Sequence, residues 1–204
     1  MKLFLDTADV KSVKARLSTG LISGITTNPT LIFKSGRHPQ TVYQELIDLG
    51  IDDISMEVVG NSEEELFKNA MGHVKTYDSK ATIKLPCTID GLKACKRLSA
   101  INVRTNVTLI FSPAQAILAS LAGATYISPF IGRMDDNSLD GMKLINDIKN
   151  TLTTDTKILA ASIRDPQSVS TAFALGADIC TVPTAVFDRM YDHVLTDKGL
   201  DQFN

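Results

Sequence analysis

The feature that most constrains this chain is a repeated alternation between short apolar segments and longer segments with helical spacing. Eight short apolar runs are typical of buried strands. They lie at Lys2–Asp6, Ile22–Thr26, Ile54–Val58, Thr82–Pro86, Asn102–Thr108, Ala124–Ser128, Lys157–Ala161 and Asp178–Val182. Strands that alternate with helices form parallel sheets, because each crossover returns the chain to the same edge. The alternation therefore predicts an α/β fold.

The segments between these runs have apolar residues spaced three and four positions apart, as amphipathic helices do. Such segments lie at Ser62–Val74, Asp90–Leu98, Pro113–Leu121, Leu139–Ile148 and Pro166–Ala174. Ser62 and Glu65 have the spacing of a capping box. Eight strand–helix units within 204 residues predict a single (β/α)8-barrel domain that covers residues 1–204.

An open doubly wound sheet is the alternative fold. Such a sheet usually has a glycine-rich phosphate loop after its first strand. Here the first strand continues into Asp6-Thr7-Ala8-Asp9, and the sequence contains no G-x-G-x-x-G or Walker motif. The barrel is therefore favoured.

Charge and composition exclude several classes of partner. The formal net charge is −2 and the basic residues are scattered, which argues against nucleic acid and acidic membranes. No apolar stretch reaches eighteen residues, so no transmembrane helix is expected. The start MKLFLDTADV is short and soon acidic, so we do not expect it to act as a signal peptide.

The cysteines and histidines point to a protein without disulfides or a metal. The three cysteines form no C-x-x-C pair and are expected to be free thiols in a reducing cytoplasm. The three histidines lie far apart in the sequence, whereas a metal site needs clustered ligands. We expect no metal and no cofactor.

Side-chain alternation along each strand predicts which residues face the barrel interior. On the fourth strand Thr82, Lys84 and Pro86 face inward, while Ile83 and Leu85 face the helices. The same alternation predicts these inward positions on other strands: Phe4 and Asp6, Ser55 and Glu57, Asn106 and Thr108, Ser128 with Phe130 beyond it, and Ala160 and Ser162 with Arg164 at the mouth. The polar residues fall at the C-terminal ends of the strands, where barrel enzymes carry out their chemistry.

Each of these residues also has a purely structural explanation. Lys84 fits a solvated rim or an ion pair, Glu57 fits a residue that neutralises Lys84, and Asp6 fits a cap for the next helix. Asn28 precedes a proline, as in many turns. Arg133 and Arg164 fit surface arginines.

Six motifs carry a resemblance to a known family. FLDTAD, GITTNPTL, IKLPCT, NVTLIFSPAQA, ISPFIGRMDD and AASIRD occur in this order. Together they resemble the transaldolase family, and most of all its short members, which include fructose-6-phosphate aldolases. The resemblance runs from about Lys2 to Pro183. It implies a TIM barrel of the class I aldolase type, in which a lysine forms a Schiff base with a ketose phosphate.

The resemblance implies a role for each matching residue. Lys84 corresponds to the Schiff-base lysine, Asp6 to the acid/base that handles the proton of the cleaved hydroxyl, and Glu57 to a carboxylate that works through a water held with Thr108. The remaining matches contact the substrate: Asn28, Asn106 and Ser128 its hydroxyls and neighbouring groups, and Arg133, Ser162 and Arg164 its phosphate.

Schiff-base chemistry on a sugar phosphate requires these residue types, whether or not the sequence resembles a known family. A lysine attacks a carbonyl only as the neutral amine, and burial favours that form. Loss of water from the first adduct needs an acid/base, which Glu57 can provide. A pair of guanidinium groups suits a terminal phosphate.

Two departures from the family pattern bear on function. Small members often continue into a longer C-terminal helix that crosses onto a neighbouring subunit, whereas this sequence stops at Asn204. We expect a homo-oligomer of undetermined size. Phe130 stands where the free-aldolase branch has tyrosine, and its ring would keep water away from the reaction intermediate. The alternative is that Phe130 is a core aromatic residue.

The expected activity is therefore that of a cytoplasmic transaldolase in the pentose phosphate pathway. It would move a dihydroxyacetone unit from fructose 6-phosphate or sedoheptulose 7-phosphate to an aldose phosphate. One alternative is a fructose-6-phosphate aldolase that releases free dihydroxyacetone. Another is an inactive barrel that binds sugar phosphates in a regulatory role.

Overall fold

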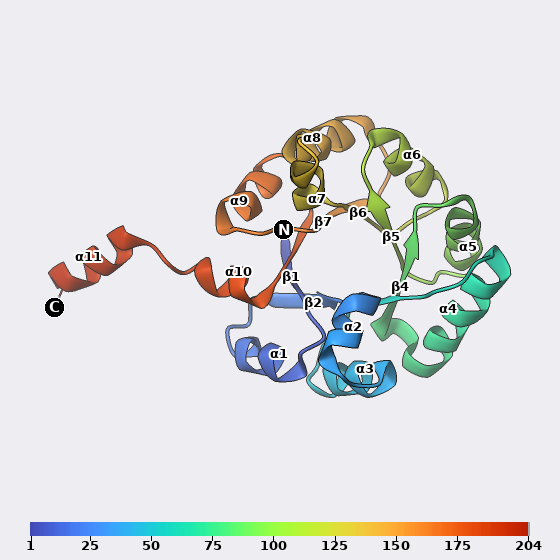
Figure 1. The fold of residues 1–204 in the computed structure, drawn as a ribbon, viewed down its shortest axis with the longest axis horizontal. Helices are drawn as coiled ribbons and strands as arrows, with labels where there is room; N and C mark the ends of the chain where they lie inside the picture. The colour runs from blue at the N-terminus through green and yellow to red at the C-terminus, as the bar shows by residue number, and fades with distance from the viewer. Residues whose placement is uncertain (204) are drawn as a thin grey trace.

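The computed structural model describes residues 1–203 and contains a closed barrel of eight parallel strands in the order β1 to β8 (Figure 1). The strands are β1 (Lys2–Asp6), β2 (Ile22–Thr26), β3 (Ile54–Glu57), β4 (Ala81–Pro86), β5 (Thr105–Ile110), β6 (Tyr126–Pro129), β7 (Lys157–Ala160) and β8 (Ile179–Val182). Parallel pairing of β8 with β1 closes the ring. The predicted (β/α)8 architecture is confirmed.

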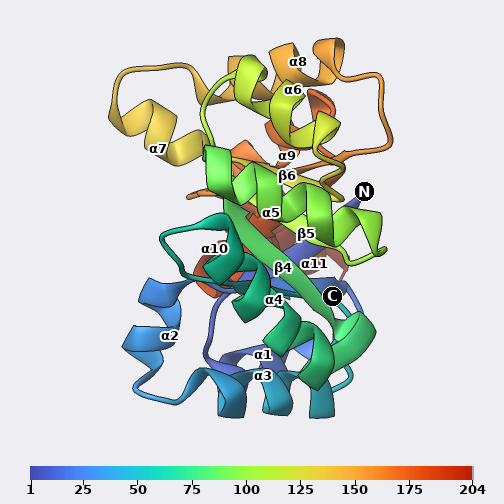
Figure 2. The same cartoon turned by 90° about the vertical axis from the view of Figure 1, so that its right-hand side faces the viewer.

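Helices surround the barrel and cover its outer face (Figures 1 and 2). The helices of the chain are α1 (Val10–Leu17), α2 (Pro29–Ser35), α3 (Pro39–Asp48), α4 (Glu63–Tyr77), α5 (Ile89–Ala100), α6 (Pro113–Leu121), α7 (Ile131–Asp136), α8 (Gly141–Thr151), α9 (Pro166–Ala174), α10 (Thr184–Arg189) and α11 (Val194–Phe203), with a short 3-10 turn at Asp78–Lys80. All but α11 lie around the barrel. Ser62 caps α4 through the Glu65 amide, as its sequence predicts. No helix among residues 1–203 is long and apolar enough to cross a membrane.

Seven of the eight strands lie within two residues of their predicted bounds, although the sixth begins at Tyr126 rather than Ala124. The fifth strand is displaced further. It begins at Thr105 rather than Asn102 and continues to Ile110. Asn102 has a left-handed backbone (φ 59°) in the turn after α5, which keeps it out of the strand. Gly123 and Gly176 have φ values of 84° and 105° in the turns that lead into the next strands. Only glycine adopts this conformation without steric cost.

Four buried apolar residues, Phe4, Tyr126, Leu159 and Ile179, pack together as a separate cluster inside the barrel, toward its N-terminal end. Phe4 fills the space beside Gly24, where a Cβ atom would lie 2.5 Å from the Phe4 ring. We call these four apolar residues the floor plug.

The floor plug corrects one prediction about the seventh strand. Leu159 faces inward, whereas Ala160 packs among the residues between barrel and helices. The register explains this, because Leu159 pairs with Ile179 and Ala160 pairs with Cys180 of β8. Ser162 lies beyond the strand in a left-handed conformation (φ 58°), so strand alternation does not determine where its side chain points.

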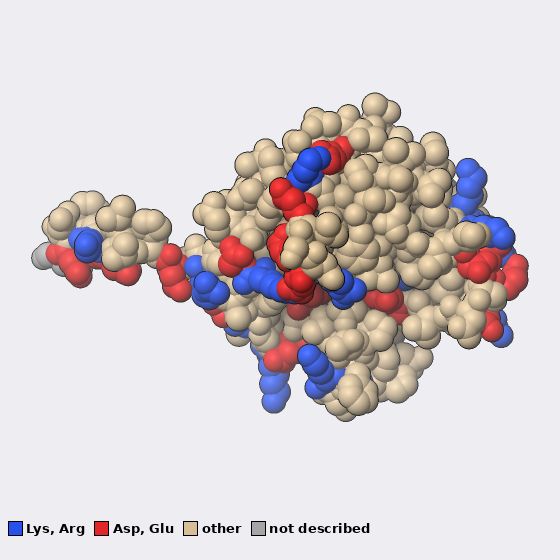
Figure 3. Space-filling model, turned by 45° about the horizontal axis from the view of Figure 1, so that its top comes forward, with Lys and Arg blue, Asp and Glu red and all other residues tan. Residues whose placement is uncertain are grey.

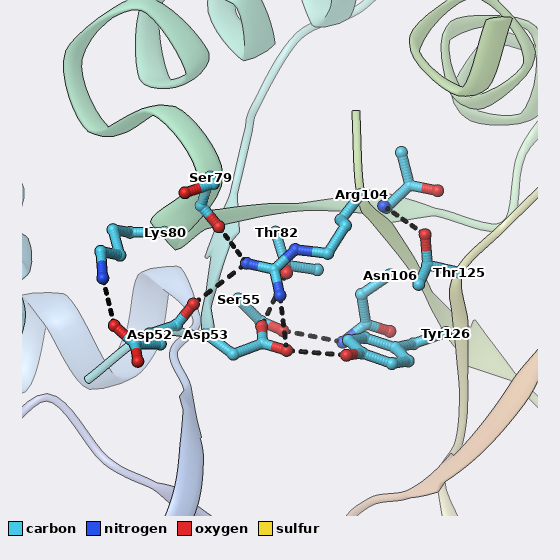
Figure 4. Close-up of polar contacts among 11 residues, drawn as sticks. Asp52, Asp53, Ser55, Ser79, Lys80, Thr82, Arg104, Asn106, Thr125 and Tyr126 are labelled. Carbon is cyan, nitrogen blue, oxygen red and sulfur yellow. Dashed lines mark hydrogen bonds and ion pairs between the residues drawn. The ribbon is translucent and has the colours of Figure 1, made fainter. Parts of the chain in front are cut away.

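A buried carboxylate, Asp53, organises a polar network at the same end (Figure 4). Thr82 donates a hydrogen bond to Asp53 Oδ1 at 2.7 Å, and the Tyr126 hydroxyl donates to Oδ2 at 2.7 Å. The Arg104 guanidinium lies 3.2 Å from the same Oδ2. Burial and the neighbouring Asp53 charge raise the pKa of Tyr126 far above its ordinary value. We call these four residues the Asp53 network.

The C-terminal helix α11 extends away from the barrel (Figure 1). None of its residues is buried, and Val194, Leu195, Leu200 and Phe203 are exposed. Figure 3 shows acidic and basic side chains interspersed over the face in view, without a broad area of one sign.

Candidate active site

Lys84 is buried inside the barrel near the C-terminal end of β4, with 5% of its surface exposed. Its Nζ lies 3.0 Å from Glu57 Oε2 and donates a hydrogen bond to the main-chain oxygen of Thr27 at 3.1 Å. Glu57 and Lys84 are register partners on β3 and β4, so the sheet itself holds the pair together. The predicted inward positions of both residues are confirmed.

Asp6 stands at the end of β1 on the same side of the barrel mouth. Its Oδ1 accepts a hydrogen bond from Thr26 at 2.7 Å, and Thr26 in turn contacts the Thr181 hydroxyl at 2.7 Å. Burial raises the pKa of Asp6 above its ordinary value, although Thr26 and Lys84 oppose that rise. Helix α1 is capped by Asp9, so the capping explanation for Asp6 is wrong.

Two adjoining cavities open over Lys84. The smaller, of about 160 Å³, is lined by residues that include Asp6, Thr26, Ser128, Ser162 and Thr181. The larger, of about 450 Å³, is lined by residues that include Glu57, Thr108 and Leu109. Four residues border both: Asn28, Lys84, Phe130 and Arg133. Together the two cavities have room for a phosphorylated sugar.

The polar side chains of the cavity walls differ in how many of their hydrogen-bonding groups have a partner in the protein. Asn28 caps α2, because its Oδ1 accepts from the Leu31 amide at 2.9 Å, and its amide nitrogen retains donor capacity for a ligand hydroxyl. Thr108 is 1% exposed, and its Oγ1 has no hydrogen-bond partner within the described residues. A buried hydroxyl without a partner is costly, so this atom is a natural contact for water or substrate.

The segment after Thr108 has a strained backbone. Leu109 has φ 61°, and the register between β5 and β6 shifts between Val107 and Ile110. A left-handed conformation is unfavourable for a residue of this size and is common at functional sites. The irregularity brings Leu109 to the wall of the larger cavity.

The aromatic and basic residues predicted at the mouth lie in two different environments. Phe130 packs edge-on against Phe111, with ring centroids 5.9 Å apart, and the Arg133 guanidinium lies 4.8 Å from the Phe130 ring centre. Arg164 instead forms two hydrogen bonds with Asp136 and borders neither cavity. A phosphate role for Arg164 would require it to leave Asp136.

The structure adds three threonines to the site that sequence reasoning did not single out. Strand alternation could have identified Thr26 and Thr181, since both are inward residues of barrel strands. Thr27 contributes its main-chain carbonyl, which accepts the hydrogen bond from Lys84 Nζ. No sequence pattern predicts a main-chain contact of this kind. The Thr27 amide and hydroxyl both donate to the Ser55 carbonyl, at 3.1 and 2.8 Å, which fixes that peptide.

The fold and site thus define a (β/α)8 barrel with a buried lysine between carboxylates at the C-terminal mouth. The family pattern described as "Transaldolase/Fructose-6-phosphate aldolase" matches residues 3–204. The chain belongs to the transaldolase/fructose-6-phosphate aldolase family.

Individual relatives agree with this assignment over the whole chain. Proteins named "Probable transaldolase" from Paracoccus denitrificans and Caulobacter vibrioides are both 48% identical to this chain. The alignments cover 100% of this chain and 95% and 94%, respectively, of those proteins. One from Lactiplantibacillus plantarum is 46% identical over 100% of this chain and 94% of its own.

A more distant likeness concerns the fold alone. The solved structure of thiamine phosphate pyrophosphorylase from Pyrococcus furiosus superposes with a TM-score of 0.59 at 17% identity, covering 89% of this chain and 85% of the other.

Proposed function

We propose that this protein is a transaldolase that moves a dihydroxyacetone unit from a ketose phosphate to an aldose phosphate. The donor is fructose 6-phosphate or sedoheptulose 7-phosphate, as in the pentose phosphate pathway. The observation that carries the proposal is the buried Lys84 amine, 3.0 Å from Glu57 and beside a cavity that Asp6 also lines. An amine with two carboxylates beside it in a pocket is what Schiff-base aldol chemistry requires.

Lys84 begins the reaction by attacking the C2 carbonyl of the donor as a neutral amine. Glu57 lies close enough to accept the lysine proton, and Thr27 holds Nζ by its carbonyl oxygen. The resulting carbinolamine loses water to form an iminium, and the acid/base for that step is Glu57. The orphan hydroxyl of Thr108 supports a water position beside it.

Asp6 then removes the proton of the C4 hydroxyl. The C3–C4 bond breaks, its electrons flow into the iminium to give an enamine on Lys84, and the aldose phosphate leaves. A carboxylate whose pKa is raised by burial is a better base than an ordinary one. The enamine attacks the carbonyl of the acceptor, and the steps run in reverse to release the new ketose.

The remaining cavity residues bind the substrate. Asn28 holds a substrate hydroxyl, and Ser128 contacts the three-carbon unit that stays on Lys84. Asn106, the other proposed contact for a substrate hydroxyl, borders neither cavity and is hydrogen-bonded to Ser128 and Ser55. The phosphate site comprises Arg133 and Ser162, both of which border the smaller cavity, with Arg164 joining when it leaves Asp136.

Donor turnover with and without erythrose 4-phosphate tests the proposal. A transaldolase consumes fructose 6-phosphate only when the acceptor is present, whereas an aldolase releases dihydroxyacetone without it. Release of dihydroxyacetone at the same rate with and without erythrose 4-phosphate would favour the aldolase. No turnover in either condition would favour an inactive sugar-phosphate-binding barrel.

Phe130 favours transfer over free aldolase activity. Its ring borders both cavities and packs on Phe111. Because phenylalanine has no hydroxyl group, residue 130 cannot hold a water near the enamine. Phe130→Tyr is expected to raise dihydroxyacetone release relative to transfer, measured in one assay with limiting acceptor. A tyrosine variant with the wild-type ratio would show that another residue separates the two activities.

The assembly and location of the enzyme are part of the proposal. The exposed apolar side chains of α11 support a homo-oligomer in which this helix packs on a second copy. The three free cysteines support a reducing cytoplasm. Sugar phosphates are the only proposed small-molecule partners, and no cofactor enters the mechanism.

A further inference from the structure

Within residues 1–203, the Lys84 amine has two polar partners of different chemistry. Nζ lies 3.0 Å from the carboxylate oxygen Oε2 of Glu57 and donates a hydrogen bond to the main-chain oxygen of Thr27 at 3.1 Å. Lys84 also borders both cavities. A protonated lysine has three donor positions. Two of them therefore face the protein, and the third is left for the substrate.

The proton balance of Schiff-base formation gives the two partners different tasks, on the proposed function. A protonated lysine and the C2 carbonyl become an iminium and one water molecule. Two of the three Nζ protons leave with the C2 oxygen by way of Glu57, the freed nitrogen electrons form the bond to C2, and one proton stays on Nζ. That last N–H needs an acceptor too weakly basic to remove the proton, and a peptide carbonyl meets this requirement.

The Thr27 carbonyl is held in place from both sides along the chain. The Thr27 amide and hydroxyl both donate to the main-chain oxygen of Ser55, at 3.1 and 2.8 Å, and so use both of its lone pairs. The Thr27 side chain is fully buried. The next residue, Asn28, caps α2 by accepting from the Leu31 amide at 2.9 Å. The peptide between Thr27 and Asn28 thus has a fixed position relative to Lys84.

We propose that Thr27 is a positioning residue, whose hydroxyl fixes its own carbonyl as the acceptor for the one proton that Lys84 Nζ keeps. The inference rests on the proposed function and assigns a task to a buried hydroxyl outside both cavities. A hydrogen bond from a cationic donor is stronger than one from a neutral donor. The contact therefore strengthens as the neutral amine becomes the iminium, and it favours formation of the covalent intermediate.

The rate constant for formation of the covalent adduct tests the inference. Wild type and variants are mixed with fructose 6-phosphate without an acceptor, quenched with borohydride at successive times, and analysed for sugar on the peptide that contains Lys84. Thr27→Val has nearly the same shape without the hydroxyl and is expected to lower this rate constant about threefold to tenfold, the effect of one hydrogen bond. Thr27→Ser keeps the hydroxyl and is expected to stay within about twofold of the wild type.

Thr82→Val is the matched control. Thr82 is also a fully buried threonine, but its hydroxyl donates to Asp53 at 2.7 Å and belongs to the Asp53 network. This variant should lose thermal stability and form the adduct at the wild-type rate. A purely structural role for the Thr27 hydroxyl would make Thr27→Val and Thr82→Val alike in both measurements.

A change to the carbonyl itself leaves every side chain intact. Replacing Asn28 by its α-hydroxy analogue converts the amide between residues 27 and 28 into an ester, whose carbonyl oxygen is a weaker hydrogen-bond acceptor. Among residues 1–203 the Asn28 amide donates no hydrogen bond, so the exchange removes no other contact of the protein. The ester enzyme is expected to form the adduct more slowly than the wild type.

The outcomes separate this inference from the proposed function. A wild-type enzyme that forms no adduct with fructose 6-phosphate refutes the proposed function. If the wild type forms the adduct, the role of Thr27 alone is refuted by a wild-type rate in Thr27→Val, by equal slowing in Thr82→Val, or by a Thr27→Ser variant as slow as Thr27→Val. Should Thr27→Val not fold, a wild-type rate in the ester enzyme refutes the role instead.

Discussion

Each end of the barrel holds a basic side chain beside a carboxylate: Arg104 and Asp53 at the floor, Lys84 and Glu57 at the mouth. The two ends differ in how many of their polar groups have hydrogen-bond partners. At the floor, both Asp53 oxygens are occupied, by Thr82 on one and by Tyr126 and Arg104 on the other. At the mouth, the Thr108 hydroxyl has no hydrogen-bond partner among residues 1–203, burial raises the pKa of Asp6, and cavities adjoin Lys84. The floor is arranged for stability, whereas the mouth keeps polar groups available for a substrate.

The sharpest test of this contrast is removal of the Lys84 amine. Lys84→Met is expected to reduce turnover below detection, because no Schiff base can form. Borohydride with fructose 6-phosphate should fix a sugar on the peptide that contains Lys84 in the wild type and on no peptide of the variant. Lys80→Met is the control, since Lys80 is a partly exposed residue paired with Asp52. Label on another lysine, with turnover retained in Lys84→Met, would overturn the mechanism.

Asp6→Asn separates activity from stability at the mouth. We expect kcat to fall by about 10²- to 10⁴-fold, the usual contribution of an acid/base. Because burial raises the folded-state pKa of Asp6, the folded protein holds this proton at pH values where the unfolded chain has lost it. The stability that Asp6 contributes is therefore full below its ordinary pKa of 3.8 and is lost as the pH rises through the folded value.

The variant is consequently expected to be more stable than the wild type at pH 7, by on the order of 1 kcal/mol. Asp9→Asn is the control, because Asp9 only caps α1 and asparagine caps equally well. Urea denaturation at pH 4 and pH 7 measures the effect. A variant that is less stable than the wild type at pH 7 would contradict the argument.

Arg133→Ala tests the phosphate site. Losing charged hydrogen bonds should raise KM for fructose 6-phosphate by about 10- to 100-fold and leave unphosphorylated fructose nearly unaffected. Arg164→Ala is expected to have a smaller effect, because Arg164 is engaged with Asp136 and borders neither cavity. Equal losses for both sugars, or a larger effect of Arg164→Ala, would count against this assignment.

The smallest effect on turnover is expected at the floor. Asp53→Asn breaks a partly buried ion pair and should lower the free energy of unfolding by about 2 kcal/mol, a shift of roughly 4–8 °C in Tm, while kcat/KM changes less than about twofold. Asp52→Asn should change neither quantity, because the Asp52 carboxylate pairs with Lys80 at an exposed position. A large loss of kcat/KM in Asp53→Asn would remove the distinction between the two ends.

The two ends also differ in how far the sequence predicts them. The mouth residues Asp6, Glu57 and Lys84 were predictable because strand alternation points them inward near the C-terminal ends of their strands. The role of Asp53 was not predictable, because its position before a strand is typical of a polar turn. Its partners Arg104 and Tyr126 are also 51 and 73 residues away in the sequence. The inward face of β7 was predicted incorrectly, because it depends on pairing with β8, which no local pattern specifies.

The floor plug has a consequence for the order of events during turnover. Side chains fill the interior of such a barrel, here with Phe4, Tyr126, Leu159 and Ile179 packed toward its N-terminal end. On the proposed function, the two aldose phosphates of a transfer must therefore enter and leave by the mouth. Both would occupy the space beside Arg133, which borders both cavities. On the proposed function, the first product must depart before the acceptor arrives, so double-reciprocal plots at several acceptor concentrations should be parallel lines.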